Sequence, residues 1–419
     1  MNDGKADRPI YGGPEKIMHK IASTSALAFI ILMGFVSMFS DMTHEGASSI
    51  LGAYLSLLGA SAATIGFVSG LGELAGYSLR LVTGYIADKT KNYWSLTLLG
   101  YIIDVFAVPL LALVPENGWM YACALIILER SGKAIKKPAK DTLLSFAASQ
   151  VGAGKSFALQ EALDQLGAFL GPVLLFAALM LKKGSVPVTE YRLCFALLFI
   201  PAVLTIALLI FAWRKFPDPE NFEAPAATGT PFKISAPFLW YIAATCIFAF
   251  GFLDFNMITM HVSREQLVAP DYLPLLYAAA MFTDAVAAVI FGWMYDKYGL
   301  KVLILSTLVA APFSILIFNF TNLYVVIAGI LLWGVGMGAQ ESVFKAAVTS
   351  IVPKETRSSG FGISQTAFGI CWFLGSWALG WLYDQNLNAM VLASTVTQLL
   401  SLPCFYLAAQ KFTGTSSQK

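Results

Sequence analysis

The chain has 419 residues, of which 57% are hydrophobic and only 12% are charged. A soluble domain of ordinary composition carries ~25% charged residues, so the sequence predicts an integral membrane protein. The formal net charge of +2 identifies no partner by itself. We expect the lipid bilayer and a small solute, and no nucleic acid, to be the partners.

The sequence lacks the motifs of common soluble enzymes. It contains no P-loop, no G-x-S-x-G, no H-E-x-x-H and no C-x-x-C. Its five cysteines stand singly in apolar runs, which indicates packing residues and neither a disulfide framework nor a metal site. We therefore expect a protein that is not an enzyme, has no cofactor, and draws energy from a gradient.

Long apolar runs recur along the whole chain. Each is long enough to cross a hydrocarbon core about 30 Å thick as a helix. They predict an all-α membrane protein with two six-helix halves, and the spans are 22–57, 61–86, 93–114, 119–149, 155–182, 191–213, 236–262, 272–294, 300–318, 323–352, 358–384 and 388–410.

A polar linker separates the two halves. It covers residues 214–235 and holds four prolines, so the halves are residues 22–213 and 236–410. The tails are residues 1–21 and 411–419. Lys and Arg concentrate on the side of the N-terminus, and the positive-inside rule then places both termini in the cytoplasm, with the chain in the cell (inner) membrane.

The two halves resemble each other in sequence. Gly84 opens GYIADK and Gly292 opens GWMYDK, each after the second span of its half. The segments that begin at Gly154 and Ser358 also align without gaps. An internal repeat of this kind in a transporter predicts a solute site near the bilayer midplane, between the halves.

The fourth span carries a stripe of charge. Arg130, Lys133 and Lys137 share one helical arc with Lys140 and Asp141, and Glu129 and Lys136 lie at its edge. A charge at the bilayer centre costs at least ~2.5 kcal/mol, so the stripe should face a water-filled cavity and bind solute. Alternatively, Pro138 ends the helix and the lysines form a cytoplasmic loop.

The first and fifth spans carry acidic clusters. Asp41, His44 and Glu45 share one face of the first span, and Glu161 and Asp164 lie on the fifth. We expect these five residues to carry protons, because His titrates near neutral pH and a desolvated carboxyl group approaches it. A divalent metal site, or a polar cluster at the outer surface, is the alternative for the first span.

The remaining polar residues of the spans fall into two predicted groups. The predicted charge network consists of Glu73, Arg80, Asp104, Asp254, Glu341 and Lys345. Further solute contacts are expected at Gln160, Gln340, Gln365 and Trp372.

These features resemble the major facilitator superfamily over essentially the whole chain. The resemblance includes G-x-x-x-D-K after spans 2 and 8, an arginine at Arg130 and a glycine-proline motif at Gly167, Gly171 and Pro172. The chain also resembles a largely uncharacterised branch of bacterial and archaeal permeases with a charged fourth span. The resemblance implies a monomer and a conformational latch made of Gly84, Asp88, Lys89, Gly292, Asp296 and Lys297.

The sequence therefore predicts a secondary active transporter that works by alternating access. A small anionic or zwitterionic organic solute, coupled to protons, fits the basic stripe and the acidic clusters. Efflux of amphiphilic drugs, export of divalent metals through the cluster on span 1, and a non-transporting sensor are the alternatives.

Overall fold

The computed structural model describes residues 14–151, 153–181, 187–219, 234–352 and 357–416. Within these residues the chain forms helices joined by short connections, with no strand, as predicted. Sixteen α-helices make twelve spans in the described residues, because four spans are each broken into two helices.

The first half comprises six spans. Its helices are α1 (Pro14–Leu57), α2 (Ala62–Thr90), α3 (Tyr93–Leu110), α4 (Trp119–Val151), α5 (Ala153–Leu181), α6 (Pro187–Leu197) and α7 (Phe199–Lys215).

The second half repeats this arrangement with more interruptions. Its helices are α8 (Ala236–Gly251), α9 (Phe255–Arg264), α10 (Leu273–Tyr298), α11 (Val302–Ala310), α12 (Phe313–Phe318), α13 (Leu323–Ala339), α14 (Lys345–Ile351), α15 (Arg357–Gln385) and α16 (Leu387–Ser416). A π-turn, Gln340–Phe344, joins α13 to α14.

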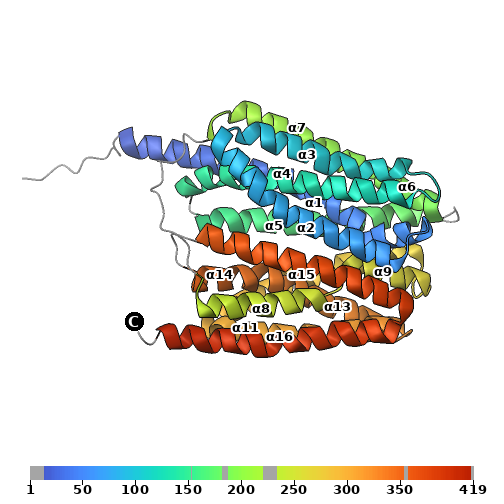
Figure 1. The fold of residues 1–419 in the computed structure, drawn as a ribbon. Coiled ribbons are helices and arrows are strands. Elements are labelled where there is room, and N and C mark those ends of the chain that lie inside the picture. Colours follow the sequence, from blue (N-terminus) through green and yellow to red (C-terminus); the bar gives the residue numbers. More distant parts are fainter. Residues whose placement is uncertain (1–13, 152, 182–186, 220–233, 353–356, 417–419) are drawn as a thin grey trace, which may run out of the picture.

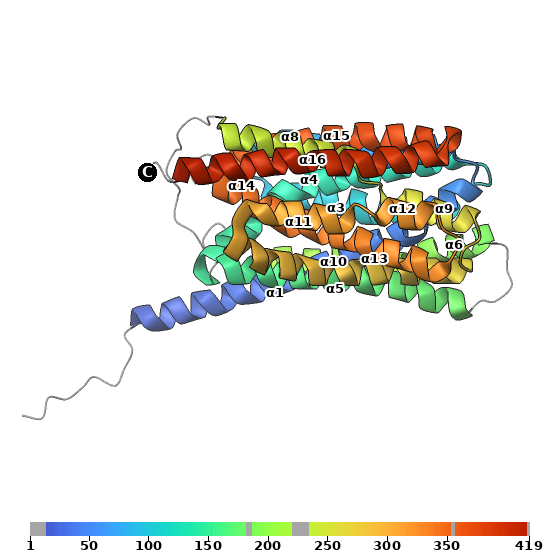
Figure 2. The ribbon, with the colours of Figure 1, turned by 90° about the horizontal axis from the view of Figure 1, so that it is seen from below.

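The two halves lie side by side with their helices running along one common direction (Figure 1). Figure 2 shows the same arrangement from below, with the start of α1 and the end of α16 at one end of the bundle. The opposite end is where α1, α9 and α15 finish and α2 begins.

Several predicted spans differ in detail. The sixth span breaks at Leu198, the seventh at Phe252–Asp254, and the ninth at Ala311 and Pro312. Proline has no N–H to donate, and an Asp side chain can cap a new helix, so such breaks arise inside apolar runs. The first helix begins at Pro14, earlier than the predicted residue 22.

Helix α4 settles one alternative from the sequence. It runs unbroken through Pro138 to Val151, so the interpretation in which Pro138 ends the helix is wrong. The lysines after Arg130 are helical residues inside the bundle.

Composition separates the spans into two kinds. Eight described segments are long and apolar enough to cross a membrane, and α13 is a shorter apolar helix. Helices α2, α4 and α15 are not among them. All three contribute polar side chains to the cavity described below, which explains why they are less apolar than the other spans.

Glycines allow the helices to approach closely where the cavity is built. A Cβ at Gly132 on α4 would lie 2.5 Å from the Asp104 nitrogen on α3. A Cβ at Gly167 or Gly171 on α5 would collide with the carbonyl of Met38 or Met42 on α1. The glycine-proline motif thus brings the acidic residues of α5 next to those of α1.

Candidate functional site

A cavity of about 430 Å³ lies between the two halves. Helices α1, α2, α4 and α5 line it from the first half, and α8, α10, α13 and α15 from the second. It brings together most of the residues that the sequence singles out. These are Asp41, His44, Glu45, Glu73, Arg80, Arg130, Lys133, Lys137, Glu161, Asp164, Asp254, Gln340, Gln365 and Trp372.

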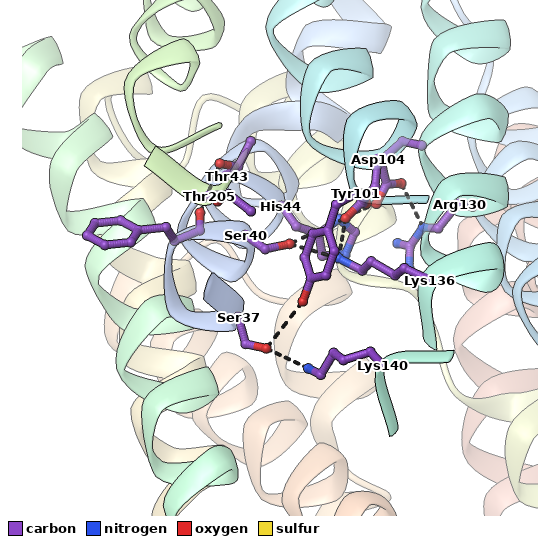
Figure 3. Close-up of polar contacts among 12 residues, drawn as sticks. Ser37, Ser40, Thr43, His44, Tyr101, Asp104, Arg130, Lys136, Lys140 and Thr205 are labelled. Atoms are coloured by element: carbon purple, nitrogen blue, oxygen red, sulfur yellow. Dashed lines mark hydrogen bonds and ion pairs between the residues drawn. The ribbon is translucent and has the colours of Figure 1, made fainter. Parts of the chain in front are cut away.

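Lys136 is the centre of a buried network in the first half. Its ammonium group forms an ion pair with Asp104 of α3 and donates to the hydroxyl of Ser40 at 2.8 Å. It also lies 4.0 Å from the centre of the Tyr101 ring. Figure 3 shows these groups converging from α1, α3 and α4. Lys136 is therefore neutralised within the protein.

A second network surrounds Arg130. Its guanidinium contacts Glu73 of α2 at 2.5 Å and Glu129 of its own helix at 3.3 Å. Glu129 is buried and also contacts Nδ1 of His44 on α1 at 2.6 Å. Buried charges persist when they are paired. Arg130 and Glu129 thus tie α1, α2 and α4 together.

The other basic residues of the cavity differ in their partners. Lys140 donates to the hydroxyl of Ser37 at 2.5 Å (Figure 3). Lys137 lies 3.8 Å from Asp141, and both side chains are more than 40% exposed, at 42% and 44%. Lys133 lines the cavity but makes no ion pair or hydrogen bond with any described residue.

The acidic groups of α1 and α5 face the same space. Asp41 and Asp164 lie close enough to repel each other electrostatically, while Lys133 attracts Asp41. Gln160 is buried beside the cavity and donates to Asp164 at 2.9 Å. Glu161 is exposed and lines the cavity. The cavity thus gathers the acidic groups of α1 and α5 and the basic groups of α4 around one space.

The first-span cluster does not assemble as a metal site. His44 turns towards Glu129, and Glu45 accepts a hydrogen bond from Tyr277 of α10. Among the described residues, no group of three or more His, Cys, Asp or Glu side chains could hold a metal ion. The cluster lies inside the cavity, so the interpretation as an outer-surface patch is wrong.

The second half faces the cavity mainly with rings. Phe344 and Phe368 lie 6.0 Å apart, and Phe368 lies 5.4 Å from Trp372. Asp254 caps α9, accepting from the Asn256 nitrogen at 2.9 Å. In the described residues, every Lys and Arg side chain that lines the cavity comes from α2 or α4.

Contacts between the halves close the end of the bundle opposite the start of α1. Arg264 of α9 donates to Ser56 at 2.8 Å and to the Ala60 carbonyl at 3.1 Å. Asp384 of α15 accepts from the Ala62 and Ala63 nitrogens of α2 at 3.2 and 2.9 Å. These hydrogen bonds hold the two halves together at this end of the bundle.

Known proteins share this architecture. A family model for the Major Facilitator Superfamily matches residues 255–416. An uncharacterised protein of Mycobacterium tuberculosis is 37% identical over 385 residues, covering 90% of this chain and 92% of that protein. An uncharacterised MFS-type transporter of Methanocaldococcus jannaschii is 24% identical over 378 residues, covering 89% and 92%. The chain belongs to the major facilitator superfamily.

Solved structures of the superfamily share its fold at low identity. A bacterial homologue of the lysosomal transporter Spinster, in an inward-facing conformation, is 13% identical with a TM-score of 0.72, covering 93% of this chain and 98% of that one. A D-xylose-proton symporter is also 13% identical, with a TM-score of 0.66, covering 91% and 97%.

The superfamily's loop motif is only partly visible. Gly84 faces Pro138 of α4, where an added Cβ would lie 3.6 Å away, and Gly292 meets nothing within 4 Å. Lys89 and Lys297 are exposed beside the tyrosines of their own helices. Other predicted residues have side chains outside the described part, namely Asp88, Asp296, Glu341 and Lys345. The latch stays a prediction.

Sequence reasoning missed several residues in and beside the cavity of this superfamily member. Lys136 and Glu129 stand at the edge of the predicted stripe, yet both are buried in the networks. Tyr277 stands in an apolar run that gives no sign of a polar contact, yet its hydroxyl donates to Glu45 across the halves. One signal was available, because Asp104 stands alone in an apolar span and requires a basic partner.

Proposed function

We propose that this chain is a secondary transporter that moves a small organic anion or zwitterion across the cell membrane, coupled to protons. The main support for this proposal is the position of Lys133. It lines the cavity between the halves and has no ion pair or hydrogen bond with a described residue. A carboxylate or phosphate of the solute would supply the charge-assisted hydrogen bond that this ammonium group lacks.

The other basic side chains of the cavity are less suited to binding the anion of the solute. Lys136 is paired with Asp104, and Arg130 with Glu73. Lys137 is half-exposed and lies near Asp141. An anion that enters the cavity would have to displace a carboxylate from Lys136 or Arg130, whereas Lys133 is available. Gln340, Gln365 and Gln160 offer amide groups nearby.

Protons would act through Asp41 and Asp164. These carboxyl groups repel each other, and Asp41 is also attracted to Lys133. A proton on Asp41 would remove both the repulsion and the attraction, so Lys133 would then take the solute anion instead. Proton and anion would therefore bind together, which is symport. Glu45, His44 and Glu161 line the same path.

In alternating access, the end of the bundle at which the two halves are in contact would change from one side of the membrane to the other. With both termini in the cytoplasm, the end closed by Arg264 and Asp384 would face outwards, and the structure would correspond to an inward-facing state. The loop motif would close the opposite end in the other state. The chain would work as a monomer.

The test is ligand-induced thermal stabilisation of the purified protein at about pH 6 and about pH 8. A ligand at ~100 times its dissociation constant adds ~2.7 kcal/mol to the native state. We expect organic anions to stabilise the protein more at the lower pH, and Lys133→Gln to remove the effect. Lys301→Gln, at an exposed lysine outside the cavity, is the matched control. Undiminished anion binding by Lys133→Gln would contradict the proposal.

Efflux of cationic amphiphiles is the second candidate. It is favoured by Glu161, which is exposed in the cavity and makes no ion pair with a described residue. Cations would then stabilise the protein, and Glu161→Gln would abolish that effect while Lys133→Gln would not. The same measurements therefore separate the two functions.

A further inference from the structure

The two walls of the cavity differ in chemistry. The wall from α2 and α4 holds the basic groups, Lys133 among them. The wall from α13, the π-turn and α15 holds aromatic rings, including Trp333, Phe344, Phe361 and Phe368. A ligand that spans the cavity therefore meets a cation at one side and ring faces at the other.

The aromatic wall keeps surface available for a ligand. Phe344, Phe361 and Phe368 are only partly buried, and all three line the cavity. Phe368 already makes edge contacts with Phe344, at 76° between the rings, and with Tyr77 of α2, at 84°. Edge-to-face and offset contacts of this kind are the favoured geometry for a further ring.

Part of the aromatic wall lies on an unusual backbone structure, a π-turn. The π-turn of Gln340–Phe344 interrupts the helix between α13 and α14. Both Gln340 and Phe344 line the cavity, so an amide and a ring are offered together. Such π-turns are frequent at functional sites. The indole N–H of Trp372 is buried nearby and has no hydrogen-bond acceptor among the described residues.

The size of the cavity limits the ligand. About 430 Å³ lies at the lower end of the range for small-molecule sites, which are mostly apolar with a few placed polar groups. It accommodates one or two fused rings with an acidic group. It exceeds what a two- or three-carbon acid would fill.

We propose that the solute is an aromatic or similarly planar organic acid. Its carboxylate meets Lys133, and its ring lies against Phe344, Phe361 and Phe368. The inference that the ligand is an anion rests on the proposed function, and the inference that its body is planar goes beyond that function. Gln340 and Gln365 then select among ring substituents that donate or accept hydrogen bonds.

The test compares probes that separate the acid from the ring. The full-length protein is titrated with benzoate, 1-naphthoate, cyclohexanecarboxylate, acetate and benzyl alcohol, and dissociation constants are measured calorimetrically. We expect the two aromatic acids to bind at least about tenfold more tightly than acetate. The affinity of cyclohexanecarboxylate should lie between that of the aromatic acids and that of acetate. Benzyl alcohol, which has the ring without the charge, should bind weakly.

Single substitutions test which residues bind the acidic group of the ligand and which bind its ring. Phe368→Leu should weaken the aromatic acids about tenfold and leave acetate unchanged, whereas Lys133→Gln should weaken every acid. Phe344→Leu is a second variant of the wall, and Phe282→Leu, at a 61% exposed ring of α10 outside the cavity, is the matched control. Unfolding temperatures of all variants without ligand confirm that each is folded.

The outcomes distinguish the two proposals. Equal affinities for acetate and the aromatic acids, insensitive to Phe368→Leu and Phe344→Leu, would overturn the planar solute and leave the anion transporter standing. Tight binding of benzyl alcohol that is insensitive to Lys133→Gln would overturn the anion site. If none of the acids binds, both proposals fail.

Discussion

The two halves of this transporter fold face one cavity with different kinds of contact. The first half is joined by ion pairs, such as Lys136 with Asp104 and Arg130 with Glu73. The second half is joined by stacked rings and by hydrogen bonds to carbonyls. Ion pairs can exchange partners when a proton or an anion arrives, whereas ring packing cannot. We therefore expect the first half to respond to ligands and the second to keep its shape.

The largest expected effect is at the buried ion pair of the first half. Asp104→Leu leaves the Lys136 ammonium buried without its carboxylate, so the free energy of unfolding should fall by about 3–5 kcal/mol. The double variant Asp104→Leu, Lys136→Met should recover most of this loss. Denaturant titration in detergent micelles measures both. A single variant as stable as the parent would show that the pair is not structural.

The second-largest loss of stability is expected at the hydrogen bond between Tyr277 and Glu45, which joins the two halves. Tyr277→Phe removes the hydroxyl that donates to Glu45, a hydrogen bond to a charged group worth about 1.5–3 kcal/mol. Tyr272→Phe, at a 45% exposed tyrosine preceding the same helix, is the control. Unfolding temperatures compare the two. Equal losses would mean that Tyr277 does not join the halves.

A hydrogen bond within the second half should matter less. Trp333→Phe keeps a ring but removes the N–H that donates to the Leu253 carbonyl at 2.8 Å, which is worth about 1 kcal/mol. Trp293→Phe changes a 75% exposed tryptophan and should be neutral. Affinity for acetate, an anion without a ring, should stay unchanged in both variants. A loss of acetate affinity in Trp333→Phe alone would show that the second half also responds to ligands.

The smallest effect is expected at the exposed pair on α4. Lys137 and Asp141 are 42% and 44% exposed and 3.8 Å apart, and exposed pairs contribute about 0–1 kcal/mol. Lys137→Ala should therefore change the free energy of unfolding by less than about 0.5 kcal/mol. A loss comparable to that of Asp104→Leu would contradict the division between buried and exposed charges on this helix.

Much of the architecture follows from the sequence. Apolar runs about as long as a membrane is thick predict the spans, and the charge on span 4 predicts that Arg130 and Lys133 face an internal cavity. The breaks near Phe252 and Pro312 were not predicted, because the apolar pattern continues through them.

The pairing of charges could not be predicted. Lys136 and Lys137 are adjacent, and helical periodicity places them only ~100° apart. Which of the two is buried depends on where α3 carries Asp104 relative to α4, and that is set by packing at Gly100 and Gly132. The partner of His44 is likewise decided by the tertiary structure. The functional roles of all these residues stay predictions.

The break at Phe252–Asp254 has a mechanical consequence. The Gly251 carbonyl accepts from Ser394 of α16 at 2.7 Å, which fastens α8 to the second half. Asn256 of α9 donates to Ser69 of α2 at 2.9 Å, which fastens α9 to the first half. The seventh span is thus anchored to different halves on the two sides of its central break. If the halves rock against each other as proposed, we expect the span to bend at these three residues, where the helix is already interrupted.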